Sequence, residues 1–230
     1  MSKPTIVLVH GGFGDASSWW HLSHLLIADG YQVVAPPTPL RGVAYDAAYL
    51  GAVIAEIDGP VVLVGHSYAG AVITVAGESE KVRGLVYVAG LVPDVGESIS
   101  NLQSILPSLE MAPLLRPREL PDGNVEVYVD PARFHEIFCA DLPAEHAAFL
   151  AAAQRPLLAS AFEEPASAAA WKTTPSWGIF GTSDHPVAPQ LQRYQYERAG
   201  TKVTEVEGAS HFLMLSNPEA VAEVIREAAA

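Results

Sequence analysis

The stretch VVLVGHSYAG, residues 61–70, decides how this chain folds. Its first four residues form a continuous apolar run, which is typical of a strand buried on both faces of a parallel sheet. A second apolar run, residues 71–76, follows almost at once and favours a helix. Ser67 stands between the two runs, with the small residues Gly65 and Ala69 at the places where the backbones crowd together. The stretch therefore predicts a sharp strand-to-helix turn that presents one serine.

Similar apolar runs recur along the chain and predict six strands. They cover residues 6–10, 32–35, 61–65, 85–89, 177–181 and 202–206. Three helices between or after these strands have recognisable start signals. They are expected to begin at Ser17 or Ser18, at Asp46 and at Pro218, and to end near Leu26, Ile57 and Ala229. The alternation predicts an α/β fold with a doubly wound, mostly parallel sheet and right-handed crossovers.

Residues 95–174 interrupt this alternation, because they contain no strongly apolar strand pattern. Helical patterns cover residues 102–109 and 135–153, and Asp122-Gly123 favours a hairpin turn. An insertion of about 80 residues is far longer than an ordinary connection between strands. We therefore expect one domain overall, with a core formed by residues 1–94 and 175–230 and a mainly helical cap, or lid, at residues 95–174.

The composition limits the classes of partner. Half of the residues are apolar, which is enough for one substantial core. Lys and Arg number 13 against 26 Asp and Glu, and the resulting net charge of −13 opposes binding to nucleic acid or to an anionic membrane surface. The single cysteine, Cys139, has no partner for a disulfide and no neighbours at metal-ligand spacing. We therefore expect neither a structural disulfide nor a metal.

The N-terminal residues enter an apolar strand directly. They lack the charged, apolar and small-residue regions of a secretion signal, so we expect a cytoplasmic protein. No apolar run reaches the roughly 18 residues that a spanning helix needs. The sequence leaves the oligomeric state open, a homodimer included.

Ser67 has the sequence context of a catalytic nucleophile. A buried strand before it and a helix after it are typical of a nucleophile elbow, although Ala69 stands where that motif usually has glycine. His211 lies between the last strand and the last helix, where the base of such a site follows in chain order. An unperturbed imidazole titrates near 6.5, so it can take the serine proton at neutral pH. We expect Ser67 and His211 to act together, with His10 as a rival base.

Two aspartates follow core strands and could orient the base. Asp184 ends the turn Gly181-Thr-Ser-Asp184, after the fifth predicted strand, and comes after the cap as the usual chain order requires. Asp94 follows the fourth predicted strand at the entrance to the cap. We expect Asp184 to be the acid and keep Asp94 as its alternative.

The turn after the first strand, VHGGFG at residues 9–14, can supply backbone donors to an oxyanion. The N–H group of Gly12, or that of Phe13, is expected to act with the N–H group of Tyr68. Aromatic residues are the candidates for the wall of a substrate pocket, although they are equally common in cores. We name Trp19, Phe138 and Phe212 as candidate pocket residues.

Four motifs together resemble a known family. They are His10-Gly-Gly-Phe-Gly14, Gly65-His-Ser-Tyr-Ala-Gly70, Gly181-Thr-Ser-Asp184 and Ala209-Ser-His-Phe212. Over nearly its whole length, the chain resembles the bacterial α/β-hydrolases related to plant methyl esterases and hydroxynitrile lyases. The resemblance implies the α/β-hydrolase fold with a helical cap, and a serine esterase that cleaves small carboxylic esters without a cofactor.

The resemblance also defines the alternatives. Related plant lyases carry Thr after the first-strand histidine and Lys after the triad histidine, whereas this chain has Gly11 and Phe212 there. A hydroxynitrile-lyase-like activity is therefore a minor alternative. A receptor or binding protein for a small molecule, built on the same constellation but without turnover, is the other alternative.

Overall fold

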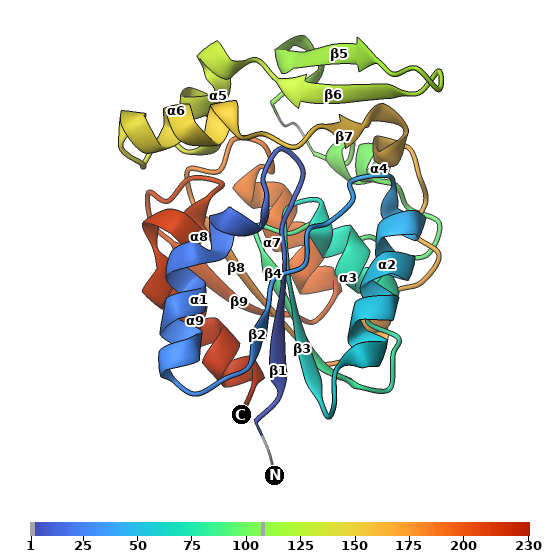
Figure 1. Ribbon diagram of the computed structural model, residues 1–230, viewed down its shortest axis with the longest axis vertical. Coiled ribbons are helices and arrows are strands. Elements are labelled where there is room, and N and C mark those ends of the chain that lie inside the picture. Colours follow the sequence, from blue (N-terminus) through green and yellow to red (C-terminus); the bar gives the residue numbers. More distant parts are fainter. Residues whose placement is uncertain (1–2, 107–108) are drawn as a thin grey trace.

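Six parallel strands form the centre of the molecule (Figure 1). The computed structural model describes residues 3–106 and 109–230. Across the sheet, the strands follow the order β2-β1-β3-β4-β8-β9. Their bounds are β1 (Thr5–Val9), β2 (Val33–Val34), β3 (Val61–His66), β4 (Val82–Val88), β8 (Ser176–Gly181) and β9 (Lys202–Val206). The first and third strands are buried along their full length, which accounts for their continuous apolar sequences.

Helices cover both faces of this sheet, as Figure 1 shows. On one face α1 packs against α9, and on the other α2 packs against α3. The helices of the core are α1 (Trp20–Ala28), α2 (Val43–Glu56), α3 (Ala69–Ala76), α7 (Pro189–Arg198), α8 (Leu213–Ser216) and α9 (Pro218–Ala228). A 3-10 turn, Ala16–Trp19, precedes α1. The parallel strands and the helical crossovers confirm the predicted doubly wound architecture.

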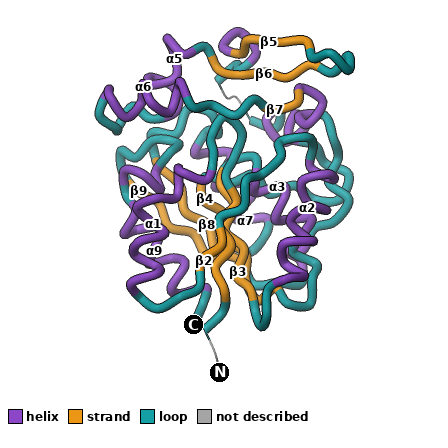
Figure 2. The backbone as a smooth tube through the Cα atoms, in the orientation of Figure 1, coloured by secondary structure: helices purple, strands orange, loops and turns teal. Residues whose placement is uncertain are grey.

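Residues 95–174, which we call the inserted segment, leave the core after β4 and return at β8 (Figure 2). A second sheet of three antiparallel strands, in the order β5-β6-β7, accompanies its helices. The elements are α4 (Ile99–Gln103), β5 (Leu115–Glu119), β6 (Val125–Val129), α5 (Pro131–Phe138), α6 (Ala144–Ala152) and β7 (Leu157–Leu158), with 3-10 turns at Ala112–Leu114, Ala159–Phe162 and Ala170–Lys172. The segment lies across the end of the sheet at which the core strands finish.

The inserted segment differs from the expected arrangement in its secondary structure. The hairpin predicted at Asp122-Gly123 is present, and Gly123 takes the positive φ of 85° that the turn requires. The third strand, β7, was not predicted, because two residues are too short to produce a pattern. The helix predicted over residues 135–153 is two helices, α5 and α6. In the pattern at 102–109, α4 ends at Gln103, and residues 107–108 lie outside the described residues.

Two of the predicted helix caps are wrong. Asp15, not Ser17 or Ser18, caps the first helical turn, since its carboxylate accepts a hydrogen bond from the Ser17 N–H group. The helix α2 begins after Gly42, and Asp46 lies one turn inside it with its side chain buried. Among the described residues, no helix combines the length and apolar character needed to cross a membrane.

Candidate active site

Ser67 occupies a strained turn at the carboxyl end of β3. Its φ is 53°, a left-handed value that is uncommon for residues other than glycine and that is maintained by the surrounding packing. A Cβ atom on Gly65 would lie 2.6 Å from the carbonyl oxygen of Ala69, so this position has no space for a side chain. At Gly70, a Cβ atom would lie 2.6 Å from the backbone nitrogen of Leu91. The second position that requires glycine is therefore Gly70, and the turn accommodates the methyl group of Ala69.

Asp184 and His211 form a buried pair. The Nδ1 atom of His211 lies 2.8 Å from Oδ2 of Asp184, and both side chains are almost fully excluded from solvent. The same carboxylate accepts hydrogen bonds from the Gln192 side chain at 2.9 Å and from the backbone N–H of Val187 at 2.9 Å. These donors fix the carboxylate, which in turn holds the proton of the imidazole on Nδ1. The Nε2 atom of His211 is then left as a proton acceptor.

Asp94 is in a different environment. Its carboxylate pairs with the ammonium group of Lys172, and it accepts the backbone N–H of Val95 at the surface. The hydrogen bond from Lys172 lowers the pKa of Asp94. The structure thus brings Asp184 to His211 and leaves Asp94 in an exposed ion pair.

The imidazole of His211 lies next to the residue that precedes Ser67. The ring centroids of His66 and His211 are 4.7 Å apart, and Nε2 of His66 donates to the carbonyl oxygen of His211 at 3.0 Å. Complete burial, and then the neighbouring His211 ring, hold the pKa of His66 well below its ordinary value, so that it stays neutral. Within the described residues, Nε2 of His211 is buried and has no hydrogen-bond partner. It is free to accept a proton from a group that enters the site.

Two backbone N–H groups beside Ser67 are also without partners in the part of the chain that the structure describes. They belong to Gly12 and Tyr68, which line the same cavity as Ser67. A Cβ atom built on Gly12 would lie 4.0 Å from the Cβ of Tyr68, so the two turns are adjacent. The N–H group of Phe13, by contrast, donates to the carbonyl oxygen of Arg155 at 3.2 Å. Of the two residues expected in this turn, Gly12 therefore has the available donor and Phe13 does not.

His10 lies apart from the hydrogen-bonded pair of His211 and Asp184. Its Nε2 atom accepts the backbone N–H of Thr38 at 2.9 Å, and its Nδ1 atom bonds the carbonyl oxygen of Gly11 at 2.9 Å. Burial lowers the pKa of His10 to about 4, so the ring is neutral at pH 7. With both nitrogens engaged, His10 supports the turn that carries Gly12 and has no free acceptor for a serine proton.

Tyr68 is anchored by a residue whose role the sequence did not reveal. Its hydroxyl group donates to Oδ2 of Asp46 at 2.8 Å, while the backbone N–H of Arg41 donates to the other oxygen at 3.1 Å. Burial raises the pKa of Asp46, because no cation accompanies this carboxylate among its hydrogen-bond partners in the described structure. Asp46 and Gln192, both buried polar residues, were missed because a single polar residue in a helix gives no signal of what it contacts.

The cavity at Ser67, which we call the serine cavity, has a volume of about 40 Å³. The core and the inserted segment both line it, mainly with apolar side chains, including Leu91, Ile99, Met111, Phe138 and Leu157. Of the aromatic residues expected in a pocket, Phe138 lines this cavity. Trp19 and Phe212 do not line it; both are fully buried and pack against His66 from outside the cavity.

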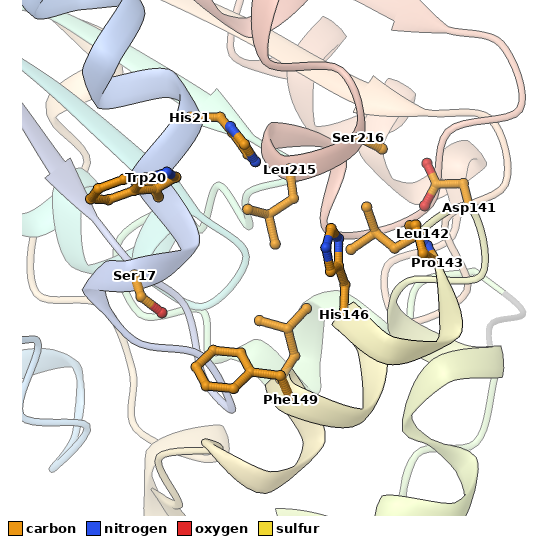
Figure 3. Close-up of a pocket in the computed structure, with 11 residues that line it drawn as sticks. Ser17, Trp20, His21, Asp141, Leu142, Pro143, His146, Phe149, Leu215 and Ser216 are labelled. Atoms are coloured by element: carbon orange, nitrogen blue, oxygen red, sulfur yellow. The ribbon is translucent and has the colours of Figure 1, made fainter.

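A larger hollow of about 530 Å³ lies elsewhere, between α1, α6 and α8 (Figure 3). We call it the outer groove. Trp20 and Phe149 form facing walls, and His21, His146 and Leu215 point into the space between them. Ser67, Asp184 and His211 are not among the residues that line it. Size alone therefore does not identify the reactive site of this molecule.

The site combines a strained serine at a strand-to-helix turn with a buried His–Asp pair and two unpartnered N–H groups, an arrangement that is typical of serine hydrolases. The chain belongs to the alpha/beta hydrolase family, whose model matches residues 6–224.

Curated relatives and a solved structure extend this assignment. The chain is 30% identical to salicylic acid-binding protein 2 of Nicotiana tabacum, over 97% of this chain and 96% of that protein. It is 23% identical to methylesterase 8 of Arabidopsis thaliana, over 97% of this chain and 88% of that protein. The crystal structure of polyneuridine aldehyde esterase superimposes with a TM-score of 0.85, at 23% identity, over 98% of this chain and 99% of the other. The predicted resemblance to plant methyl esterases is confirmed.

Proposed function

We propose that this protein hydrolyses small carboxylic esters through an acyl-enzyme on Ser67. The buried pairing of His211 with Asp184, which leaves Nε2 of the imidazole free, is the observation that supports this proposal most strongly. Such a pair is the arrangement that activates a serine hydroxyl, because the carboxylate selects the tautomer and stabilises the imidazolium that forms.

In this mechanism, Oγ of Ser67 attacks the ester carbonyl while Nε2 of His211 takes its proton. The N–H groups of Gly12 and Tyr68 stabilise the oxyanion of the tetrahedral intermediate, where one such donor contributes about 3 kcal/mol. His211 then returns the proton to the departing alcohol, and an acyl group remains on Ser67. Water, deprotonated by His211, releases the carboxylic acid and regenerates the serine.

The serine cavity supports a small, uncharged acyl group. A volume of about 40 Å³ is well below the roughly 300 to 1,000 Å³ of sites that enclose drug-sized ligands. Its apolar walls favour aliphatic or small aryl groups over charged ones. We propose acetate-sized esters as the preferred substrates, with larger ones admitted only when the inserted segment moves as a lid.

Hydroxynitrile-lyase-like chemistry is less well supported. A Cβ atom on Gly11 would lie 2.8 Å from the carbonyl oxygen of His66 and 2.9 Å from the Cβ of Ser67, so the threonine of the related lyases has no space here. The lysine of those lyases is replaced by the apolar Phe212. No cation is therefore positioned after His211 to stabilise a departing cyanide.

Binding without turnover at the same cavity is the second candidate function. The tobacco relative, named for binding salicylic acid, supports it. To distinguish the two functions, p-nitrophenyl acetate hydrolysis and labelling by a fluorophosphonate probe should be measured for the wild type and for Ser67→Ala. Hydrolysis and labelling in the wild type, both lost in the variant, are the expected result. A wild type that neither hydrolyses the ester nor takes the label would contradict the esterase proposal and favour binding.

A further inference from the structure

Ser210, His211 and Phe212 each make one backbone hydrogen bond to a residue far away in the sequence. Nε2 of His66 donates to the carbonyl oxygen of His211 itself. The backbone N–H groups of the two neighbouring residues, Ser210 and Phe212, instead donate to acceptors in the inserted segment. Ser210 N–H donates to Oδ2 of Asp141 at 3.1 Å, and Phe212 N–H donates to the carbonyl oxygen of Phe138 at 3.1 Å. Two of these three hydrogen bonds come from the inserted segment, while the N–H group of Ser183, in the core, donates to the carbonyl oxygen of Ala209 earlier in the same loop.

Asp141 makes the stronger of these two attachments. Its second oxygen, Oδ1, accepts the hydroxyl proton of Ser210, so one carboxylate takes both donors of one residue. Among the described residues, Asp141 directs its hydrogen bonds to Ser210 only and forms no ion pair. Hydrogen bonds to an ionised acceptor are about twice as strong as neutral ones. The carboxylate of Asp141 therefore serves to hold Ser210, the residue that precedes His211.

Residues 138–141 of the inserted segment also cover the imidazole of His211. The ring of Phe138 meets the ring of His211 edge-on, with centroids 5.5 Å apart and planes at 75°. Phe138 lines the serine cavity, whereas Asp141 is not among its lining residues and lines the outer groove instead (Figure 3). Asp141 can thus act on the base without touching a substrate in the serine cavity.

We propose that Asp141 is a positioning residue, which sets the place of the catalytic base by holding Ser210. This inference rests on the proposed function of Ser67 and His211. Asp184 fixes the orientation of the imidazole from the core, and Asp141 fixes the backbone on which the imidazole stands. A catalytic group displaced by about 1 Å can lose a hundredfold in rate. The base is therefore fully in place only when the inserted segment is docked.

The test compares Asp141→Ala with Asp141→Asn and Ser210→Ala. Asp141→Ala removes both carboxylate oxygens and leaves the Ser210 hydroxyl only the carbonyl oxygen of Phe138, at 3.3 Å. It should lower kcat for p-nitrophenyl acetate about thirtyfold to a hundredfold, with KM changed less than threefold. Asp141→Asn can still accept the Ser210 N–H, and its amide can donate to the Ser210 hydroxyl, which turns round. This variant should keep kcat within about threefold of the wild type. A loss in Asp141→Asn as large as that in Asp141→Ala would contradict a role through these hydrogen bonds.

The double variant Asp141→Ala/Ser210→Ala tests whether the two residues act as one unit. Because Ser210→Ala removes only one of the two bonds, it should lower kcat by less than Asp141→Ala. The double variant should be no slower than Asp141→Ala alone, since the partner is already lost. Two losses that multiply would show independent effects and overturn the proposal.

Asp130→Ala is the matched control for damage to the inserted segment. Asp130 caps α5, accepting the Ala132 N–H and pairing with Arg116, and among the described residues none of its hydrogen bonds or ion pairs reaches the His211 loop. Its loss should destabilise the segment while kcat per active site, counted by fluorophosphonate titration, stays within about twofold. If Asp130→Ala lowered kcat as much as Asp141→Ala does, the effect of Asp141→Ala would be explained by general destabilisation of the inserted segment. That result would contradict the proposal.

A readout that does not need turnover separates this inference from the esterase proposal. The proton on Nδ1 of His211, shared with Asp184, can be observed as a downfield ¹H resonance. It should shift or broaden in Asp141→Ala and recover in Asp141→Asn. If the wild type hydrolyses no ester but this pattern holds, the esterase proposal fails and the positioning of His211 stands. An unchanged resonance in Asp141→Ala would overturn the positioning role whatever the activity.

Discussion

The core and the inserted segment contribute to the same site in different ways. The core supplies Ser67, Asp184 and His211 from the turns that follow its strands, and Ser67 has a strained positive φ there. The inserted segment supplies apolar walls, the ring of Phe138 and the carboxylate of Asp141. In the proposed mechanism, the reacting side chains therefore stand on turns of the core sheet. The size of the substrate and the placement of His211 depend on the inserted segment. Substitutions in the core and substitutions in the inserted segment should therefore differ in which property they change and by how much.

The largest expected effect, on the core side, comes from the acid. Asp184→Asn should lower kcat for p-nitrophenyl acetate about 10⁴-fold, because the amide favours the wrong imidazole tautomer. Asp94→Asn, in which the exposed pair with Lys172 is weakened, should change kcat less than twofold. Steady-state kinetics of both variants decide the assignment. The opposite ranking would make Asp94 the acid.

A smaller effect, on stability, should follow from the nucleophile turn. Gly70→Ala places a methyl group against the backbone of Leu91 and should lower the free energy of unfolding by about 3 kcal/mol. Ala69→Gly is the matched variant one residue earlier; it removes a methyl group that the turn already accommodates, and should cost about 1 kcal/mol or less. Urea denaturation followed by circular dichroism measures both. Equal losses would contradict the view that the close approach falls at Gly70.

On the inserted-segment side, acyl size should be the sensitive variable. The small serine cavity should make kcat/KM for p-nitrophenyl octanoate about thirtyfold lower than for the acetate. Leu157→Ala, which removes a wall residue packed against Gly12, should reduce this preference several-fold while leaving the acetate rate nearly unchanged. A chain-length series run on both proteins provides the comparison. An octanoate preference in the wild type would show that the inserted segment does not limit acyl size.

The smallest effect concerns pH and the turn that carries Gly12. The pKa of His10 is lowered from 6.5 to about 4 in the folded protein, so the unfolded chain binds the proton first as the pH falls. Stability contributed by neutral His10 is present above pH 6.5 and declines below it, by about 2 kcal/mol between pH 7.5 and 5. His10→Gln can keep both hydrogen bonds without a titrating group, and should lose correspondingly less. Denaturation curves at the two pH values should show this difference, and an identical loss in both proteins would contradict it.

The contrast between the two regions also determines what the sequence could predict. The last core strand, Lys202–Val206, matches its predicted bounds although it is a partly exposed edge strand, because glycine-containing turns at Gly200 and Gly208 limit it on both sides. β4 begins at Val82, three residues before the prediction, because the exposed Arg83 interrupts its apolar pattern. In the inserted segment, the hairpin turn and the helical character of residues 135–153 were predictable, whereas the break between α5 and α6 and the strand β7 were not.

Within the site, positions defined by local backbone geometry were predictable and those defined by tertiary contacts were not. Ser67 and Gly12 lie in glycine-containing turns whose patterns are recognisable from the sequence. The hydrogen bond from Phe13 N–H to Arg155, which leaves Gly12 as the available donor, joins residues far apart in the chain. The same is true of Asp141 with Ser210. Such contacts can be identified only once the position of the inserted segment relative to the core is known.

In the proposed mechanism, Ser67 forms a covalent acyl intermediate within the core. This step is tested most directly by acid-quenching the reaction with p-nitrophenyl acetate during the first turnover and locating the acetyl group by peptide mass spectrometry. We expect an acetyl group on the peptide that contains Ser67, formed together with a burst of p-nitrophenol and absent in Ser67→Ala. Turnover without acetylated Ser67, or with the acetyl group on another residue, would contradict the account.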